Sequence, residues 1–454
     1  MKIEDKENKK RLALRKSAVK LLGVCMLSTV SLGAQAANWL MLQGTEPASA
    51  AGRAKVWGFI QAQYQKDDSD PCTAAACGPA TDGYIPPKLI GPNLDSQSAF
   101  NVNRARFGVR GTGFPLDPNV NYFLLAELGN NGITAGSDGK ILSDASITLN
   151  YIKGARIRVG LFKTPGFEEG LQAIHVFDYV NFTTVGNQLM LERFPREGDV
   201  FHIPQPTPQA GMNAYSASVG AFRDVGIQVF DTFKMSSWEH SYALMIGNGN
   251  GLNYSDNDDN KDVYAYWSSE LVYGGKGPRR QGLKMFAWYQ GGKRTNAFDR
   301  TKEQDRTREG VGVKYLKKPF RFTAEYLKGK GMIFQGQHRP GPNPDGSVSD
   351  FNGIYNDEEA SGYYVDFGWY IPGSNWELDL RYDSYTRGEN HQASAANDES
   401  RFDTVTVGTQ YHFNKKTRLN LDYASRSFES DTAPVDANLE GVKGRLALQL
   451  THIF

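Results

Sequence analysis

The sequence predicts an all-β protein, a transmembrane antiparallel β-barrel of about 16 strands with long extracellular loops and short periplasmic turns. Three observations predict this fold: segments of alternating polar and apolar residues, connections that are alternately short and long, and many glycines and aromatic residues. The 454 residues include 48 Gly, 25 Phe, 22 Tyr and 7 Trp. A mean hydropathy of −0.50 excludes a bundle of transmembrane helices. A barrel strand needs an apolar residue only at every second position.

The alternation is clearest in residues 101–111. Arg104, Arg106 and Arg110 share one parity, and the apolar residues between them share the other. Successive side chains of a strand point to opposite faces, so this segment has a charged face and an apolar face. Similar segments, of about the length that a tilted strand needs to cross a membrane, recur at 54–65, 119–128, 144–151, 155–163, 223–230, 241–247, 262–273, 282–290, 309–316, 320–327, 362–370, 375–385, 403–413, 417–428 and 444–454.

The connections between these segments alternate in length. Tight turns are expected at 153–154, 317–319, 372–375 and 414–416. The longer connections, rich in Gly, Asp, Asn and Pro, are 66–98, 164–222, 248–261, 291–307, 329–359, 386–400 and 428–442. Outer-membrane barrels keep short turns on the periplasmic side and long loops outside, whereas a soluble sandwich has no reason to do so. A terminal aromatic residue, Phe454, after an amphipathic strand resembles the signal read by the outer-membrane assembly machinery.

Residues 1–36 have the pattern of a signal peptide: a basic start, a short apolar stretch over Leu21–Leu32, and small residues before a cleavage point after Ala36 or Ala37. The apolar stretch is too short to span a bilayer, and a buried N-terminal helix is the alternative. Cleavage leaves one barrel domain over 37–454 and takes away eight basic and three acidic residues, which changes the net charge from +1 to −4. A nucleic-acid-binding protein is therefore not expected. The expected location is the bacterial outer membrane.

Two cysteines, Cys72 and Cys77, remain in the exported chain and are expected to close a small loop as a disulfide. The seven histidines are scattered and no haem-attachment motif occurs, so no cofactor is expected. An alternating acidic stretch resembles a calcium loop but lacks the glycine and the closing glutamate of an EF-hand. The residues at alternate positions of this stretch are Asp256, Asp258, Asn260 and Asp262. The favoured interpretation is a solvated extracellular loop, and the alternative is a metal site.

In a barrel, the apolar face of residues 101–111 meets lipid and the arginine face meets the lumen. Arg156 and Arg158 also lie on the polar parity of their segment, so that five inward arginines are expected on neighbouring strands. Rows of basic side chains in a pore favour anions over cations. The alternative is cross-strand pairing with Glu127 and Asp144, which would make the arginines structural.

The connection 164–222 is far longer than a turn requires and too apolar for disorder. It is expected to fold into the lumen and narrow the pore. A cap packed on the extracellular rim is the alternative. The charged and polar residues expected at the constriction are Glu168, Glu169, His175, Asp178, Glu192, Arg193, Arg196, Glu197 and Asp199.

The stretches "DASITLNYIKGARIRVGLFKTPGFEEG" and "FRDVGIQVF", followed by "SYALMIGNGNGLN", resemble the phosphate-selective porin O/P family of Gram-negative bacteria. The resemblance implies a sixteen-stranded barrel, usually a trimer, with an inward third loop and a ladder of arginines that leads anions to the constriction. The five inward arginines are the residues that match the ladder. Members that bind phosphate also have lysines at the constriction, whereas this third loop opens with Glu168 and Glu169 and has no lysine after Lys163.

The favoured function is therefore passive diffusion of small solutes through a water-filled, anion-leaning channel, with phosphate and other oxyanions as candidate solutes. Its expected partners are outer-membrane lipid and lipopolysaccharide, small anions, and two further copies of the chain in a homotrimer. The alternative is a barrel that encloses a partner, such as a multihaem cytochrome of an electron conduit. An enzyme is not expected, because His412 and His452 at strand ends have no nucleophile beside them.

Overall fold

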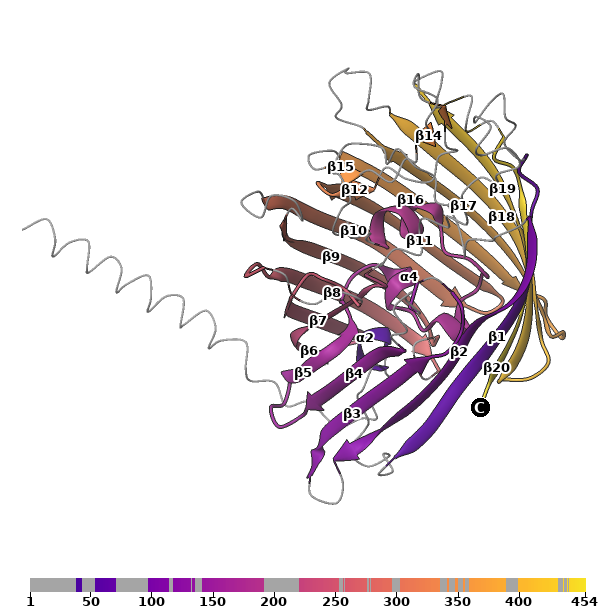
Figure 1. Cartoon of the computed structure of the whole chain (residues 1–454). Helices are drawn as coiled ribbons and strands as arrows, with labels where there is room; N and C mark the ends of the chain where they lie inside the picture. The colour runs from indigo at the N-terminus through magenta and orange to yellow at the C-terminus, as the bar shows by residue number, and fades with distance from the viewer. Residues whose placement is uncertain are drawn as a thin grey trace, which may run out of the picture. The chain divides into compact units, whose positions relative to one another are not determined.

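Sixteen antiparallel strands form a closed barrel in the computed structural model, each hydrogen-bonded to its neighbours in chain order, and β1 pairs with β20 to close the ring (Figure 1). The predicted fold class is confirmed. The structure describes residues 38–42, 54–70, 97–113, 117–131, 133–134, 141–191, 220–252, 256, 258–275, 277, 279–295, 303–334, 341–342, 348–349, 354–355, 359–388, 399–431, 436, 439 and 441–454. The expected signal peptide, 1–36, lies outside these residues.

All sixteen barrel strands fall on the segments predicted from alternation, and most are longer than predicted. They are β1 (Lys55–Asp67), β2 (Ser98–Gly113), β3 (Asp117–Glu127), β4 (Leu142–Leu149), β5 (Arg156–Lys163), β6 (Arg223–Met235), β7 (Trp238–Gly247), β8 (Asp262–Gly274), β9 (Gln281–Thr295), β10 (Glu303–Lys317), β11 (Phe320–Lys330), β16 (Glu359–Tyr370), β17 (Trp376–Arg387), β18 (Ser400–His412), β19 (Thr417–Ser430) and β20 (Arg445–Ile453). Two small sheets lie in the connection between β11 and β16: β12 (Ile333–Phe334) with β15 (Ile354–Tyr355), and β13 (Gly341–Pro342) with β14 (Val348–Ser349).

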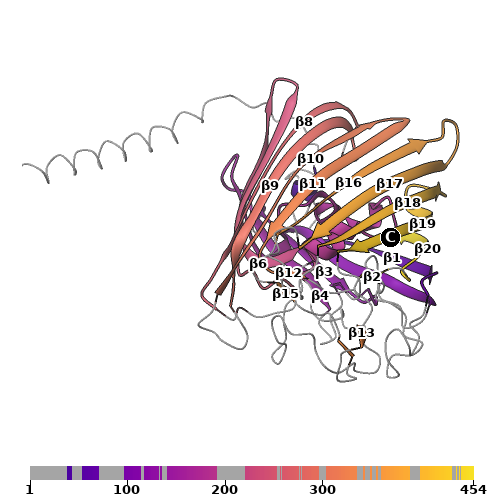
Figure 2. The same ribbon diagram turned by 90° about the horizontal axis from the view of Figure 1, so that it is seen from above.

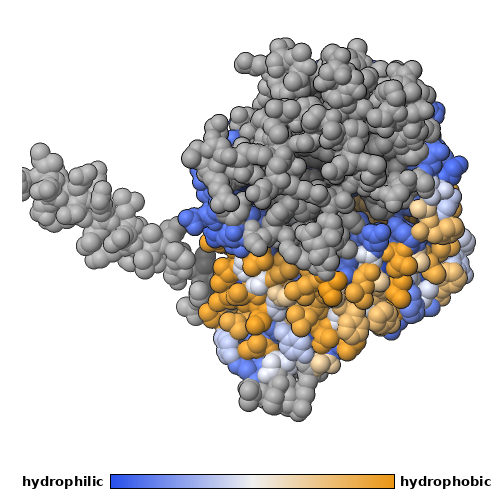
Figure 3. Space-filling view, viewed as in Figure 1, coloured by the Kyte–Doolittle hydropathy of each residue, from blue (hydrophilic) through white to orange (hydrophobic). Residues whose placement is uncertain are grey.

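The two faces of the strands differ as the alternation predicts. Phe107 is 47% exposed on the outer face of β2, whereas its neighbour Arg106 is buried on the inner face. Figure 3 shows apolar side chains gathered in a band over the visible outer surface of the strands. Such a band is what a barrel presents to lipid. None of the described helices is long and apolar enough to cross a membrane.

A β-bulge in β2 decides which of its side chains face inward. Gln61 pairs with Arg104 and Ala62 with Val102, so that Asn103 is an extra residue in the ladder. Before the bulge, even-numbered residues face outward: Phe100 is 84% and Val102 is 48% exposed. After it, even-numbered residues face inward, which places Arg104 and its successors in the lumen.

The short connections are compact turns with local hydrogen bonds. In the turn between β18 and β19, the Asn414 side chain accepts hydrogen bonds from the backbone N–H groups of Lys416 (2.8 Å) and Thr417 (3.0 Å). An asparagine in this position stabilises a turn by imitating a backbone acceptor. Only two residues, 236–237, connect β6 and β7.

Two segments outside the strand ladder lie within the ring of strands (Figures 1 and 2). The first is residues 164–191, the described N-terminal part of the connection between β5 and β6, here called the inner loop. It contains α4 (Glu168–Leu171), the 3₁₀-helix η2 (Ile174–Val176) and the π-helix η3 (Gly186–Met190). The second is the short helix α2 (Trp39–Leu42), which precedes β1.

Candidate pore constriction

The inner loop is joined to the barrel wall by buried ion pairs, of which those of Glu168 come first in the chain. The Glu168 carboxylate lies 2.6 Å from the Lys284 ammonium group and 3.3 Å from that of Lys314. The two lysines are directly opposite each other on β9 and β10. Burial raises the pKa of the Glu168 carboxyl, but the two ammonium groups outweigh burial and hold that pKa below its usual value.

Glu169, the next residue, has a different environment. Its carboxylate accepts hydrogen bonds from the Thr183 hydroxyl (2.6 Å) and backbone N–H (3.2 Å), and lies 3.4 Å from the Arg381 guanidinium group of β17. Complete burial nevertheless raises the pKa of Glu169 to about 8, with the nearby carboxylate of Asp366 acting in the same direction. Glu168 therefore favours its ionised form, whereas the adjacent Glu169 favours its protonated form.

Asp178 connects the loop to two arginines. Its carboxylate lies 2.6 Å from Arg279, in the turn between β8 and β9, and 3.3 Å from Arg321 of β11. Burial raises the pKa of Asp178, but these guanidinium groups have the larger effect and hold the pKa well below its usual range. Arg279 also donates a 2.7 Å hydrogen bond to the Val176 carbonyl. A periplasmic turn therefore reaches up to the inner loop.

Backbone groups of the inner loop are satisfied by side chains of the opposite wall. The N–H of Val180 donates to Asp422 (2.5 Å) and that of Thr184 to Asp383 (2.7 Å). Arg418 donates to the Phe177 carbonyl at 2.6 Å. Irregular backbone at membrane depth is tolerated only where protein groups satisfy it, and β17 and β19 supply those groups here.

His175 packs among aromatic rings at the base of β1. Its ring centroid lies 4.9 Å from that of Phe59 and 6.0 Å from that of Trp57. Burial lowers the pKa of His175 to about 3, and the positive charges of Arg106 and Arg418 act in the same direction. The side chain therefore serves as a neutral packing group.

The arginines of β2 lie on the lumen side and have specific partners. Arg104 donates to the Gln61 side-chain carbonyl at 3.2 Å, and Arg106 forms a 2.7 Å ion pair with Glu127. The guanidinium group of Arg110 lies 5.7 Å from the centroid of the Phe123 ring.

The arginines of β5 are arranged in a similar way. Arg156 lies 3.2 Å from Asp231. Arg158 is buried, donates to Thr148 at 3.4 Å and stacks 4.3 Å from the Phe230 ring centroid. Of these five arginines, Arg106 is the one that forms an ion pair with Glu127.

Asp144 binds a cation that was not among the predicted site residues. It accepts hydrogen bonds from both Nε (3.2 Å) and Nη2 (3.0 Å) of Arg223, the first residue of β6. Arg223 is thus the ion-pair partner of Asp144, for which the alternative interpretation gave the arginines of β2 and β5.

Sequence reasoning also missed Lys284 and Lys314. Both lie on the inward parity of their strands, alternating with outward apolar residues, and this signal was present in the sequence. The third loop has no lysine of its own after Lys163, and these two lysines reach it from the barrel wall.

The candidate metal residues do not come together. Asp262 begins β8 and accepts both terminal nitrogens of Arg294, at 2.8 and 2.9 Å. Asp256 forms a 2.8 Å ion pair with Lys261, and Asp258 caps the backbone N–H of Asn260. Within the described part of the chain, no group of three acidic, His or Cys side chains is arranged to hold a metal ion.

Several predicted site residues fall outside the described part of the chain. They are the expected disulfide partners and the second half of the predicted constriction, namely Cys72, Cys77, Glu192, Arg193, Arg196, Glu197 and Asp199.

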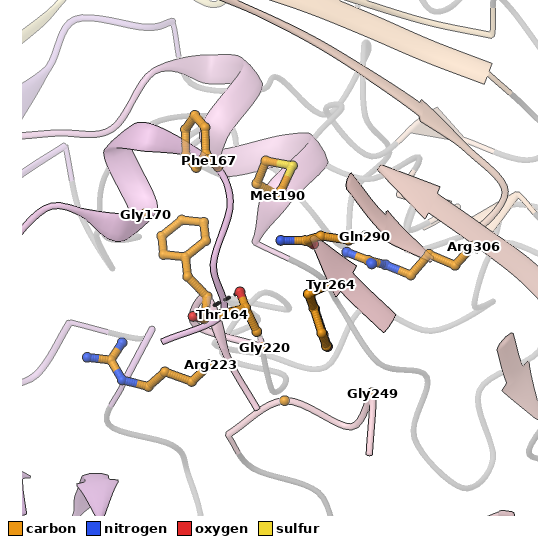
Figure 4. Close-up of a pocket in the computed structure, with 12 residues that line it drawn as sticks. Thr164, Phe167, Gly170, Met190, Gly220, Arg223, Gly249, Tyr264, Gln290 and Arg306 are labelled. Atoms are coloured by element: carbon orange, nitrogen blue, oxygen red, sulfur yellow. Dashed lines mark hydrogen bonds between the residues drawn. The ribbon is translucent and has the colours of Figure 1, made fainter. Parts of the chain in front are cut away.

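A small hollow separates the inner loop from the wall of β6–β10 (Figure 4). Phe167 and Met190 of the inner loop line one side. The Gln290 amide and the Arg306 guanidinium group approach it from β9 and β10, and Tyr264 borders it from β8. The hollow thus has an apolar side formed by the loop and a polar side formed by the barrel.

Residues 291–450 match the family of phosphate-selective porins O and P. The resemblance expected from the sequence is confirmed, and the family and fold indicate a channel.

Solved outer-membrane channels share the fold of this chain. DcaP of Acinetobacter baumannii is 13% identical, with 91% of this chain and 100% of that chain covered at a TM-score of 0.50. The OmpF of Salmonella typhi, in complex with daunomycin, is also 13% identical, with 88% of this chain and 97% of that chain covered at 0.50. The anion-selective porin from Comamonas acidovorans is 13% identical, with 88% of this chain and 99% of that chain covered at a TM-score of 0.48. No curated protein sequence matches the chain.

Proposed function

We propose that this porin is a water-filled channel for passive diffusion of small solutes and that it favours anions. One observation carries the proposal: the wall formed by β2–β6 has more basic than acidic side chains. Among the described residues of these strands, six arginines (Arg104, Arg106, Arg110, Arg156, Arg158 and Arg223) stand against four buried carboxylates (Glu127, Asp144, Asp224 and Asp231). Fixed positive charge along a pore lowers the barrier for anions and raises it for cations.

The distribution of charge across the lumen supports the same proposal. The inner-loop carboxylates Glu168 and Asp178 form ion pairs with the side of the barrel that runs from the β8–β9 turn to β11. Glu169, with its pKa raised to about 8, adds little negative charge at pH 7. The negative charge of the inner loop is therefore neutralised by lysine and arginine side chains of that side of the barrel. The wall formed by β2–β6 therefore keeps its excess of basic over acidic side chains.

Anions in general, rather than phosphate alone, are the proposed solutes. Two lysines of the barrel wall, Lys284 and Lys314, already contact the Glu168 carboxylate. Phosphate and other oxyanions remain candidate solutes that would be recognised by guanidinium groups, which bind such oxygens in bidentate fashion.

The zero-current potential across a planar bilayer in a potassium chloride gradient tests the proposal. The purified porin should show the sign of an anion-selective channel. Arg104→Gln combined with Arg158→Gln should reduce that potential by about half. Arg401→Gln, which removes an arginine with a half-exposed side chain from β18, is the matched control and should leave it unchanged. A cation-selective wild type would overturn the proposal.

We also propose that the channel works as a homotrimer in contact with outer-membrane lipid and lipopolysaccharide, after removal of the signal peptide. The family resemblance supports the trimer, and the outward apolar side chains support the lipid contact. Chemical cross-linking of the protein in native membranes should give a ladder that ends at three copies. The cytochrome-sleeve alternative is not supported, because the comparisons match porins and the inner loop lies in the lumen.

A further inference from the structure

The helix α2 lies inside the barrel, although it precedes the first strand. Trp39 is 4%, Leu40 2% and Met41 4% exposed, and all three belong to the same buried apolar cluster as Leu189 and Met190 of the inner loop. A four-residue helix is not stable on its own and depends on such packing. The lumen of the barrel buries its apolar side chains.

Specific contacts fix α2 near the periplasmic end of the lumen. The Asn38 amide donates to the Ser241 hydroxyl at 2.5 Å, and the Asn38 carbonyl oxygen accepts the Met41 N–H at 3.1 Å. Ser241 lies three residues after β7 begins, directly beyond the two-residue turn. Asn38 therefore both caps the helix and attaches it to the wall.

The helix shares a lysine with the inner loop. The Lys314 ammonium group lies 5.9 Å from the Trp39 ring centroid and also contacts the Glu168 carboxylate at 3.3 Å. Lys314 lies three residues before the end of β10, close to another short turn. Trp39 and the inner loop thus meet at the same point of the wall, and together they narrow the same side of the lumen.

We propose that residues 38–42 form a plug that restricts the channel from the periplasmic side and that can leave the lumen. The inference rests on the proposed channel function. Few polar contacts hold the described segment, which precedes β1 in the chain. The expected cleavage after Ala36 or Ala37 would make this segment the free end of the mature chain. A free end can withdraw without disturbing the strand ladder.

Single-channel recording of the full mature porin and of a variant that lacks residues 38–42 tests this inference. The variant should have about twice the conductance and fewer closures, because a wider lumen conducts more ions. Trp39→Ala should shift conductance in the same direction, whereas Trp376→Ala on the outer face is the matched control. Heat-modifiable migration in gels verifies that each variant is a folded barrel.

A reversible cross-link gives a second, independent readout. Asn38→Cys with Ser241→Cys, in a Cys72→Ser and Cys77→Ser background, should form a disulfide that holds the plug in place. Oxidised channels should stay at low conductance, and reduction should restore the wild-type record.

Equal conductance of the wild type and the deletion variant, with an anion-selective wild type, would overturn the plug and leave the channel function intact. A silent wild type with a conducting deletion variant would support the plug. Silence of both folded proteins would overturn both proposals.

Discussion

Glu168 lies between Lys284 and Lys314, with its two carboxylate oxygens 2.6 Å and 3.3 Å from their ammonium groups. The chain's own carboxylate thus occupies the position where two adjacent lysines could hold an anion. The ion pair also fixes α4 of the inner loop against β9 and β10. One side chain therefore has two effects, one on selectivity and one on stability.

The first prediction concerns Glu168→Gln. Removing one charge of a buried ion pair leaves two ammonium groups without their counter-charge, so the free energy of unfolding should fall by about 3–5 kcal/mol. In folded channels the freed lysines should increase anion selectivity, and added inorganic phosphate should block chloride current. Urea unfolding and bilayer recording measure these effects.

Glu169→Gln is the matched control for that variant. Burial raises the pKa of Glu169 to about 8, so the carboxyl is mostly protonated at pH 7 and an amide replaces it with little loss. A loss of stability as large as that of Glu168→Gln would contradict this assignment.

The second prediction concerns pH and His175. Burial lowers the pKa of His175 from 6.5 to about 3, so the unfolded chain takes up a proton before the folded chain does. Its contribution to stability is complete above pH 6.5 and is lost as the pH falls toward 3. At pH 4 the wild type should lose about 3 kcal/mol from this residue.

His175→Phe keeps an aromatic ring in contact with Phe59 and removes the titrating group. Urea midpoints at pH 7 and pH 4 should therefore differ less in this variant than in the wild type. The carboxylate of Glu168, whose pKa is lowered, also loses stability in acid, so some dependence should remain. An unchanged pH dependence would show that His175 is accessible to protons in the folded state.

The third prediction concerns the bulge at Asn103. Deleting this residue removes the extra position but leaves Val102 opposite Ala62, so Val102 and Phe100 should keep facing lipid. The folded fraction measured by heat-modifiable migration should therefore stay close to that of the wild type. Asn103→Ala keeps the residue count and should also fold normally. A strong fall in the folded fraction of the deletion variant would show that the bulge itself is needed for the pairing of β1 with β2.

The fourth prediction concerns Asp178→Asn, which removes the charge between Arg279 and Arg321. The β8–β9 turn then loses its ionic contact with the inner loop, and the two guanidinium groups repel each other more strongly. We expect noisier single-channel currents with the same reversal potential sign. Asp117→Asn, on an exposed side chain at the periplasmic start of β3, is the control. Quiet currents in Asp178→Asn would indicate that Arg279 holds the turn through its carbonyl contact alone.

The strands of the barrel could be predicted from the sequence because alternation is a local property of the chain. That Arg104 and Arg106 share a face follows from their parity, whereas the bulge that puts Phe100 and Val102 on the opposite face was not predicted. The partners of these residues could not be predicted in the same way. Lys284 and Lys314 are 116 and 146 residues from Glu168, and only closure of the barrel brings them together.

The position of α2 was also beyond sequence reasoning. A four-residue helix is too short to show a hydrophobic period, and its burial depends on a lumen formed by strands that come much later in the chain. The burial of residues 164–191 could be predicted, because a long apolar connection must bury its side chains somewhere.

The backbone hydrogen bonds of the inner loop have a consequence for the order of assembly. Val180 is held by Asp422 and Thr184 by Asp383, partners that lie 242 and 199 residues further along the chain. Until those acceptors are in the strand ladder, the N–H groups of Val180 and Thr184 lack their partners on the wall. The inner loop can therefore reach its final position only once β17 and β19 are in place.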